Sequence, residues 1–411
     1  MAQPSTSLAS LAQAALEAAR ALGFDLAAIL PVAAPDPPMS EAHPLGGSTI
    51  SPRAASRYRA WVEQGFHGEM AYLSQADSGS KRLCPENLFP GLRSILVVGI
   101  NYHTPPVARA LMDDPSRGAI ASYAWGIDYH TVLAGKLSRL AALIAVLARQ
   151  PVAHRAFVDT GPVLERELAD RAGLGFLGKN TCLISPGIGS WLFLGELFLS
   201  LELPASLLSH RSGNAARPSA LSCGRCSRCL QACPTGALVA PHVLDSRRCI
   251  SYLTIELKGS VPRELRPMLG NRVFGCDVCQ GVCPWNKRFA RPTSEPSFDP
   301  GVDSIAPRLL DLLALDDDAF TRRFHRSPVR RARRRGLLRN AAVALGNWGS
   351  PDAVPALVQA LHDAEPLVRG HSAWALGRIQ TPDARRALES ALPGETDRQA
   401  RAEISLALVG R

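Results

Sequence analysis

The apolar and polar positions in the first half of the chain alternate between strand-like runs and helical spacing. Strands are predicted at residues 93–102, 153–158 and 191–203, and helices at residues 130–149 and 164–171. Pro162 suits the first turn of the second helix. This order predicts a mixed α/β domain over residues 1–215.

A repeat with a spacing of 31 positions follows near the end of the chain. The tripeptide Ala-Leu-Gly at residues 344–346 recurs at 375–377, each followed by a Pro-Asp turn, and a frayed third copy begins at Ala407. Each copy predicts two helices that cannot bury their apolar faces alone. We therefore expect residues 296–411 to hold a basic linker and a short all-α solenoid for docking, which resembles HEAT repeats.

Two cysteine runs carry the clearest chemical signal. The first has the C-x2-C-x2-C-x3-C-P spacing of a bacterial two-cluster ferredoxin, whose fourth cysteine binds the other cluster. The second run is one cysteine short, because Val273 holds that place, and the isolated Cys249 can supply the missing ligand. The predicted ligand sets are Cys223, Cys226, Cys229 and Cys283 for one 4Fe–4S cluster, and Cys233, Cys249, Cys276 and Cys279 for the other.

Zinc ribbons are the alternative interpretation of these cysteines. Zinc sites need pairs with C-x2-C spacing, whereas three cysteines at x2-x2 spacing followed by x3-C-P do not suit them. Residues 216–295 are therefore predicted to form a ferredoxin-like domain that carries two 4Fe–4S clusters and transfers electrons.

Composition narrows the cellular setting. The chain has 411 residues and ten cysteines, of which we expect Cys84 and Cys182 to be small buried thiols outside the clusters. Labile clusters and spare thiols favour a reducing cytoplasm. The N-terminal region lacks the pattern of an export signal, and no run of 18 uncharged apolar residues predicts a membrane span.

A basic segment precedes the repeats. The formal net charge is +10, and residues 321–339 hold nine arginines and no acidic residue. A solvated linker or helix face is the alternative, but arginine is the better bidentate ligand for phosphate. We predict nucleic-acid contact through five of these residues: Arg330, Arg331, Arg333, Arg334 and Arg335.

Two near-matches to known motifs do not support their usual functions. The glycines at 173, 175 and 178 have G-x-G-x-x-G spacing, but they follow a predicted helix instead of a strand, which disfavours a nicotinamide site. Asp128-x-His130 resembles the motif by which some proteins supply histidine to the cobalt of cobalamin, but Leu133 replaces its glycine. His130 is therefore expected to be a packing or hydrogen-bonding residue.

Several strings resemble those of the epoxyqueuosine reductase family of tRNA-modifying enzymes. They are VDTGPVLER at 158–166, GLGFLGKNTC at 173–182, GSWLFLG at 189–195, CISYLTIE at 249–256, and the two cysteine runs with their gap at Val273. The resemblance covers roughly residues 10–390, including the HEAT-like tail.

The resemblance implies an oxidoreductase that reduces epoxyqueuosine to queuosine at the wobble position of tRNA, the last step of queuosine biosynthesis. It implies an α/β domain that is similar to reductive dehalogenases and binds cobalamin, fed by two 4Fe–4S clusters. The implied partners are tRNA and an external low-potential electron donor, and the implied state is a monomer.

The resemblance also implies roles for individual residues. Asp159 would donate the proton, for which we expect a raised pKa, although an aspartate before a helix is also a common N-cap. Six further residues would contact cobalamin, although each also suits a turn: Arg82, Lys179, Asn180, Thr181, Ser251 and Tyr252.

Two other functions use the same motifs. A cobalamin and Fe–S reductive dehalogenase-like enzyme would act on small molecules, but it has no use for nine arginines and a solenoid. A non-catalytic Fe–S electron carrier that binds nucleic acid would need no cobalamin, so cofactor binding separates it from the reductase.

Overall fold

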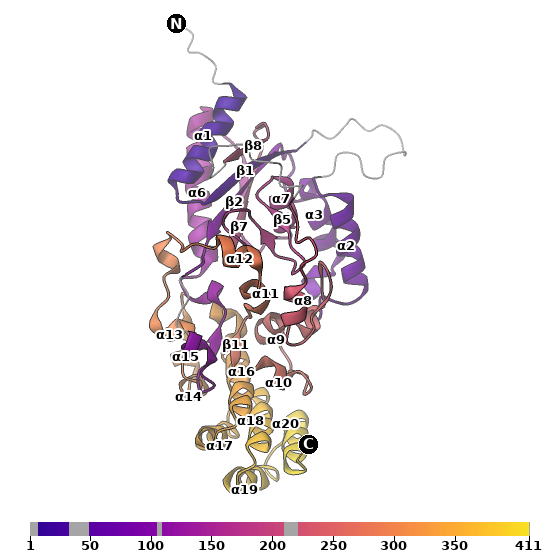
Figure 1. The fold of residues 1–411 in the computed structure, drawn as a ribbon, viewed down its shortest axis with the longest axis vertical. Coiled ribbons are helices and arrows are strands. Elements are labelled where there is room, and N and C mark those ends of the chain that lie inside the picture. The colour runs from indigo at the N-terminus through magenta and orange to yellow at the C-terminus, as the bar shows by residue number, and fades with distance from the viewer. Residues whose placement is uncertain (1–6, 33–48, 105–108, 209–220, 411) are drawn as a thin grey trace.

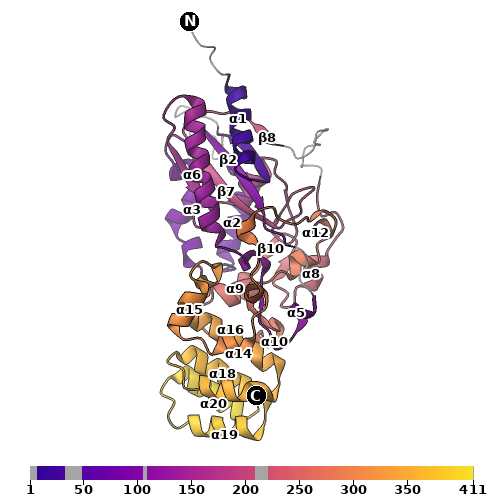
Figure 2. The ribbon, with the colours of Figure 1, turned by 90° about the vertical axis from the view of Figure 1, so that its left-hand side faces the viewer.

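Three parts follow one another along the long axis of the molecule (Figures 1 and 2). The computed structural model describes residues 7–32, 49–104, 109–208 and 221–410. An α/β part lies at the end that carries α1 (Leu8–Ala21), the cysteine-rich segment lies in the middle, and the helical repeats lie at the other end. The predicted boundary between the first two parts falls largely on residues 209–220, outside the described ranges.

Five antiparallel strands form the central sheet, in the order β4-β7-β2-β1-β8. Their bounds are β1 Leu26–Pro31, β2 Ser94–Asn101, β4 His154–Phe157, β7 Leu192–Leu199 and β8 Ser206–Leu208. β2 and β7 pair over their full length and are almost entirely buried, as expected for central strands covered on both faces. The three strands predicted from the sequence are confirmed.

Helices cover both faces of this sheet (Figure 1). α1 and α6 (Tyr129–Ala148) pack on one face through apolar residues such as Leu16 and Leu137. The other face is covered by α7 and three shorter or more polar helices. These helices are α2 Pro52–Glu63, α3 Ala76–Leu83, α4 Pro85–Leu88 and α7 Glu165–Arg171. The result is a three-layer α/β arrangement.

Helix α6 is long and apolar enough to cross a membrane by length and composition alone. The sequence predicts no membrane span here, because no run of 18 uncharged apolar residues occurs in it. In the structure Leu133, Leu137 and Leu140 of this helix are fully buried against the sheet. Lys136 on the same helix forms an ion pair of 2.7 Å with Glu295. These contacts are those of a core helix that covers a sheet.

Short elements make up the cysteine-rich segment. They are α8 Arg228–Ala232, β9 Leu238–Ala240, β10 Val243–Leu244, α9 Ile250–Ile255, α10 Arg266–Leu269, β11 Arg272–Phe274, α11 Val278–Gly281 and α12 Pro284–Phe289. β11 pairs in parallel with β3 (Ala119–Ile120) of the preceding part. Val273 lies in β11 and is fully buried, so the place of the missing cysteine is a core position here.

Five helices form the repeats. α16 (Arg333–Trp348), α18 (Pro366–Ile379) and α20 (Arg398–Leu408) stack side by side, with α17 (Val354–Ala360) and α19 (Pro382–Ala391) beside them. The repeated glycine makes this stack possible. A Cβ atom at Gly346 would come within 2.9 Å of Ala375 Cα, and one at Gly377 within 2.9 Å of Ala407 Cα. The predicted solenoid is confirmed.

Helix α16 joins the repeats to the cysteine-rich segment through two buried polar side chains. Arg339 is 1% exposed and donates to the carbonyls of Leu253 at 2.6 Å, Leu257 at 2.8 Å and Gly259 at 2.7 Å. Asn340 donates at 2.8 Å to the carbonyls of Thr254 and Val273. Since buried carbonyl groups need donors, these bonds fix the cysteine-rich segment on the solenoid.

A buried ion pair makes a second connection. Arg266 of α10 is 1% exposed and meets Glu403 of α20 through two hydrogen bonds, of 2.5 and 3.0 Å. Its Nε also donates to the Val261 carbonyl at 2.9 Å, and its guanidinium lies over the ring of Trp374. The last helix is therefore tied directly to the segment that carries the cysteines.

Removing one partner of this pair should destabilise the whole chain. We expect Glu403→Gln to lower the free energy of unfolding by about 3–5 kcal/mol, because Arg266 is then a buried charge without its counter-ion. Urea unfolding measures the change. The matched control is Glu389→Gln, which breaks the exposed pair with Arg385 and should change stability by less than about 1 kcal/mol. Equal, small losses in both variants would contradict the assigned role.

Candidate active site

Asp159 lies where β4 ends and the chain turns towards α7. Its φ of 54° is in the left-handed region, which aspartate tolerates better than most residues. Arg82, 8% exposed, donates to the carbonyls of Gly161 at 3.5 Å and Val163 at 3.3 Å, and so holds the turn. Backbone strain of this kind is typical of functional sites.

Three donors converge on the Asp159 carboxylate. The Tyr129 hydroxyl donates to Oδ2 at 2.8 Å, and His130 Nε2 and Arg331 Nη1 each lie 3.5 Å from the same atom. Burial opposes ionisation, but His130, Tyr129 and Arg331 together lower the pKa of Asp159 to about 2. We expected a raised pKa for a proton donor. These donors stabilise the ionised carboxylate instead.

His130 links two carboxylates. Its Nδ1 lies 2.7 Å from Asp128 Oδ1, and its Nε2 approaches Asp159. Burial favours the neutral ring, but the two carboxylates outweigh it and raise the pKa of His130 to about 9. His130 is therefore a charged hydrogen-bonding residue of the site, and its ring nitrogens are engaged with carboxylates instead of being presented as cobalt ligands.

Arg331 connects the site to the rest of the molecule. It comes from the basic segment that precedes α16, and its Nε forms a 2.6 Å ion pair with Glu256, which follows α9. Its Nη1 reaches Asp159. Tyr123 lies close by, with ring centroids 6.2 Å from Tyr129 and 5.9 Å from Phe274 of β11. All three parts of the chain therefore meet at Asp159.

The structure brings together the first predicted set of cluster ligands. Burial raises the pKa of Cys283, and Cys223 and Cys226 are among its neighbours. The same two thiols are the neighbours of Cys229. Cys283 is one of the more deeply buried thiols, at 8% exposed, and it packs with Phe176 and Ile184.

The second predicted set also lies together and contains one thiol more than expected. The neighbours of Cys249 include Cys233, and those of Cys279 include Cys276 and Cys249. Cys182 forms a hydrogen bond with Cys279, so it lies against this set. We expected Cys84 and Cys182 to be buried thiols, but both are half-buried. The position of Cys182 next to Cys279 was not predicted from the sequence.

The cysteine sets can be compared with what a single metal ion requires. Within the described ranges, no three cysteine, histidine or acidic side chains converge as ligands of one metal ion would. A 4Fe–4S cluster places its own iron and sulfide atoms between the thiolates, so its ligands stand farther apart.

The side chains of Lys179 and Asn180 contact the loops that carry the cysteines. Lys179 Nζ donates to the carbonyls of Gly224 at 2.7 Å and Cys226 at 2.9 Å. The Asn180 side chain donates to the Cys279 carbonyl at 3.5 Å. Thr181 has a φ of 68°, and its carbonyl accepts from Arg166 at 2.5 Å. The glycine-rich run before them contains β5 (Phe176–Leu177) and is followed by a turn, not by a helix, which disfavours a dinucleotide site.

Ser251 and Tyr252 lie on α9, directly after Cys249. The Tyr252 hydroxyl accepts from the Glu69 N–H at 2.7 Å. A Cβ atom at Gly68 would come within 2.5 Å of the same hydroxyl, so this loop must carry glycine. Tyr252 thus fixes the loop at 68–69 beside the second cysteine set, and Ser251 is half-buried next to it.

The predicted tRNA-contacting arginines divide into two groups. Arg331 is held by Asp159 and Glu256, and Arg334 forms a 2.5 Å ion pair with Asp363 and is 15% exposed. Arg330 and Arg333 are exposed, and Arg335 is half-buried. Only this second group has side chains without a carboxylate partner among the described ion pairs.

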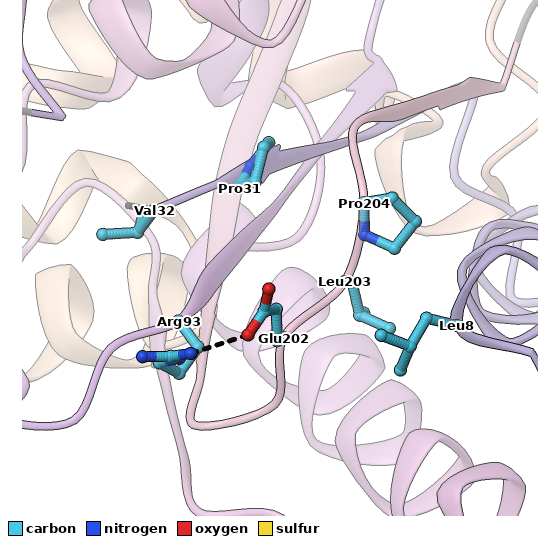
Figure 3. Close-up of a pocket in the computed structure, with 7 residues that line it drawn as sticks. All are labelled: Leu8, Pro31, Val32, Arg93, Glu202, Leu203 and Pro204. Atoms are coloured by element: carbon cyan, nitrogen blue, oxygen red, sulfur yellow. Dashed lines mark hydrogen bonds and ion pairs between the residues drawn. The ribbon is translucent and has the colours of Figure 1, made fainter. Parts of the chain in front are cut away.

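A surface pocket elsewhere does not overlap this site. Figure 3 shows it at the edge of the sheet, beside the 2.6 Å ion pair between Arg93 and Glu202. None of the candidate site residues lines it. Sequence reasoning had missed Tyr129, Tyr123 and Glu256 as members of the site, because nothing in the order of the chain places them next to Asp159.

Comparison with known families agrees with these groupings. Residues 82–160 match the family described as epoxyqueuosine reductase QueG, residues 222–286 match a 4Fe–4S double cluster binding domain, and residues 330–408 match HEAT repeats. The epoxyqueuosine reductase of Xanthomonas campestris is 45% identical over 323 residues, which are 78% of this chain and 87% of that protein. The enzyme of Pseudomonas aeruginosa is also 45% identical, over 77% of this chain and 85% of that protein.

Solved structures show the same arrangement over nearly the whole chain. An epoxyqueuosine reductase bound to an epoxyqueuosine-modified tRNA-Tyr stem loop superposes with a TM-score of 0.84 at 30% identity, covering 98% of this chain and 99% of that one. The Bacillus subtilis enzyme, with its catalytic aspartate loop swung out of the active site, gives a TM-score of 0.83 at 29% identity, covering 98% of this chain and 100% of that one.

The charge on His130 should appear in the pH dependence of stability. Its folded-state pKa of about 9 lies above the ordinary 6.5, so its contribution is complete below pH 6.5 and is lost as pH rises through 9. His130→Gln should therefore lower the free energy of unfolding by roughly 1–3 kcal/mol more at pH 6 than at pH 10. Urea unfolding at both pH values measures this. The exposed control His154→Gln should show no such difference, and equal losses for His130→Gln at both pH values would contradict the charge.

Proposed function

The chain belongs to the epoxyqueuosine reductase family, and we propose that it reduces epoxyqueuosine in tRNA to queuosine with Asp159 as the proton donor. It is accordingly an oxidoreductase. The observation that carries the proposal is the convergence of Tyr129, His130 and Arg331 on the Asp159 carboxylate, at the point where all three parts of the chain meet. A general acid must be held in place by such contacts before it can act on a bound substrate.

We propose that cobalamin binds beside Asp159. Two buried polar atoms on segments that flank it have no hydrogen-bond partner within the described residues: Arg82 Nε and Ser122 Oγ. The corrin ring carries amide side chains that both donate and accept hydrogen bonds, so it fits such atoms. Tyr72 is 44% exposed beside the same charges and offers an aromatic wall.

The proposed division of work follows from this fit. Cobalamin, when bound, supplies the low-valent cobalt that reduces the epoxide, and the chain binds, orients and protonates. Arg82, Thr181, Ser251 and Tyr252 are proposed to line the cofactor. Lys179 and Asn180 are proposed to support the cofactor site indirectly, because their side chains donate hydrogen bonds to carbonyl groups of the cysteine loops.

Electrons are proposed to reach the cofactor through the two clusters. The double cluster domain supports two 4Fe–4S clusters, and the ligand sets named above are our assignment. The set with Cys249 is proposed to be the one nearer to the site. Asp277, the residue after Cys276, accepts a hydrogen bond from the Ser122 N–H at 2.7 Å, and the residue after Ser122 is Tyr123 of the site. We propose that an external low-potential donor delivers electrons to the other cluster in the reducing cytoplasm, and that the enzyme acts as a monomer.

The tRNA is proposed to dock along the basic segment. A relative is known in complex with a modified tRNA stem loop, and the basic segment here leads from exposed arginines to Arg331 at the site. We propose that Arg330, Arg333 and Arg335 contact phosphates, that Arg331 acts within the site, and that Arg334 stabilises the fold through Asp363.

Changing Asp159 to Asn should stop turnover. The amide keeps the size of the side chain but cannot donate a proton to the epoxide oxygen, so we expect a loss of about 10²–10⁴-fold. Mass spectrometry of nucleosides from modified stem loops measures the reaction, and iron and cobalt analysis verifies that both cofactors are bound. The control is the exposed Asp77→Asn on α3. Full activity of the Asp159 variant with both cofactors loaded would overturn the assignment.

Neutralising Arg330, Arg333 and Arg335 together should weaken tRNA binding. Losing three phosphate contacts should reduce the slope of log K against log salt by about 2–3. A matched control replaces three exposed arginines at the far end of the repeats: Arg385, Arg386 and Arg398. Filter binding at several salt concentrations measures both slopes, and the same slope in both triple variants would contradict this docking surface.

A further inference from the structure

Glu196 is a buried acid in the middle of the sheet. It lies on β7, opposite Phe157 of β4 and Val97 of β2, and is fully buried. Neither of its carboxyl oxygens has a hydrogen-bond partner within the described residues. The neighbours on the same face of the strand, Leu194 and Phe198, are apolar core residues. A leucine would suit this position better for stability alone, so the acid needs a functional explanation.

Glu165 lies between Glu196 and the site. It is the first residue of α7, which packs on β7, and its Oε1 accepts from the Asp159 N–H at 2.5 Å. Burial raises the pKa of Glu165 to about 8, with the charge of Asp159 acting in the same direction and Arg166 and His130 acting against it. Burial, then Glu165 and Asp159, likewise raise the pKa of Glu196. Glu165 thus lies next to Asp159 on one side and interacts with Glu196 on the other.

The reaction needs more protons than Asp159 holds. Reduction of the epoxide takes up two electrons and two protons, and the oxygen leaves as water. One carboxyl group carries one proton, and Tyr129, His130 and Arg331 keep Asp159 ionised at neutral pH. The first and the second proton must therefore both reach Asp159 from neighbouring groups or from water.

We propose that Glu165 and Glu196 form a proton reserve behind Asp159 that supplies it during one turnover. This inference rests on the proposed function. The Glu165 carboxyl passes its proton to the Asp159 carboxylate, which gives it to the substrate oxygen. Glu196 then passes its proton through Glu165 to Asp159 for the second transfer to the same oxygen, and solvent returns two protons to Glu165 and Glu196 after the product leaves. Two protons and two electrons are consumed for each queuosine and water formed.

The arrangement explains why two acids lie behind the donor. The pKa values of the half-buried Glu165 and the fully buried Glu196 are both raised, so the pair holds its protons at neutral pH. The proton is then available without water entering a site that reduces a reactive epoxide. Glu165 and Glu196 are positioning and relay residues, since Asp159 alone contacts the substrate.

The test replaces Glu196 by glutamine in the full chain with both clusters and cobalamin loaded. Glutamine has the same shape and no proton to give, so we expect kcat to fall about ten- to a hundredfold while KM for the modified stem loop stays unchanged. The solvent deuterium isotope effect on kcat should rise, because the second proton must then come from water. The matched control is Glu167→Gln, a buried glutamate on α7 that accepts from the Ser51 N–H at 3.2 Å.

A second readout does not depend on turnover. Infrared spectra at neutral pH should show carbonyl absorption of protonated carboxylic acids that shifts in D₂O, and Glu196→Gln should lose the part of it that belongs to Glu196. If that variant does not fold, Glu165→Gln serves the same test, because its amide oxygen can still accept from Asp159. Wild-type kcat and isotope effect in a folded variant would overturn the reserve.

The two proposals can fail separately. A wild-type chain that leaves epoxyqueuosine unchanged would refute the proposed function, whatever the infrared band shows. An active wild type whose carboxylic acid absorption keeps its full intensity in Glu196→Gln and in Glu165→Gln would refute the proton reserve and leave the proposed function standing.

Discussion

The structure depends on how α16 satisfies the buried carbonyl groups of the cysteine-rich segment. Arg339 and Asn340 donate to carbonyls in the stretch between Cys249 and Cys276, at Leu253, Thr254 and Val273 among others. An unsatisfied buried carbonyl is costly, so the segment cannot shift relative to α16 without losing several bonds together. Arg331 lies a few residues before α16, so the same hydrogen bonds help to fix its position beside Asp159.

The electrostatics of the site follow from that placement. Tyr129, His130 and Arg331 come from different elements and make Asp159 a stable carboxylate, whereas Glu165 and Glu196 behind it favour their protonated forms. Groups whose pKa values are pushed in opposite directions are typical of sites that move protons. Arg331 also joins the basic segment to Asp159. The binding of tRNA phosphates to this segment would therefore change the electrostatic potential around Asp159.

The sequence predicted much of this fold because its signals are local. Strand runs, the spacing of the cysteines and the Ala-Leu-Gly repeat each specify an element or a set of ligands without knowledge of distant contacts. The contents of the site are different, because Tyr129 and Arg331 reach Asp159 only through the packing of distant segments. The same limit applies to the roles of the arginines. The sequence gives their positive charge, but only the structure shows that Arg334 pairs with Asp363 and Arg331 with Glu256.

The central claim is that Asp159 delivers the proton to the oxygen of the epoxide. The most direct measurement is a crystal structure of this chain, loaded with cobalamin and both clusters, in complex with a stem loop that carries epoxyqueuosine. The account predicts an Asp159 carboxyl oxygen within hydrogen-bond distance of the epoxide oxygen, with the modified base between Asp159 and the cobalt. An epoxide oxygen that contacts another acid, with Asp159 still paired to Arg331, would contradict it.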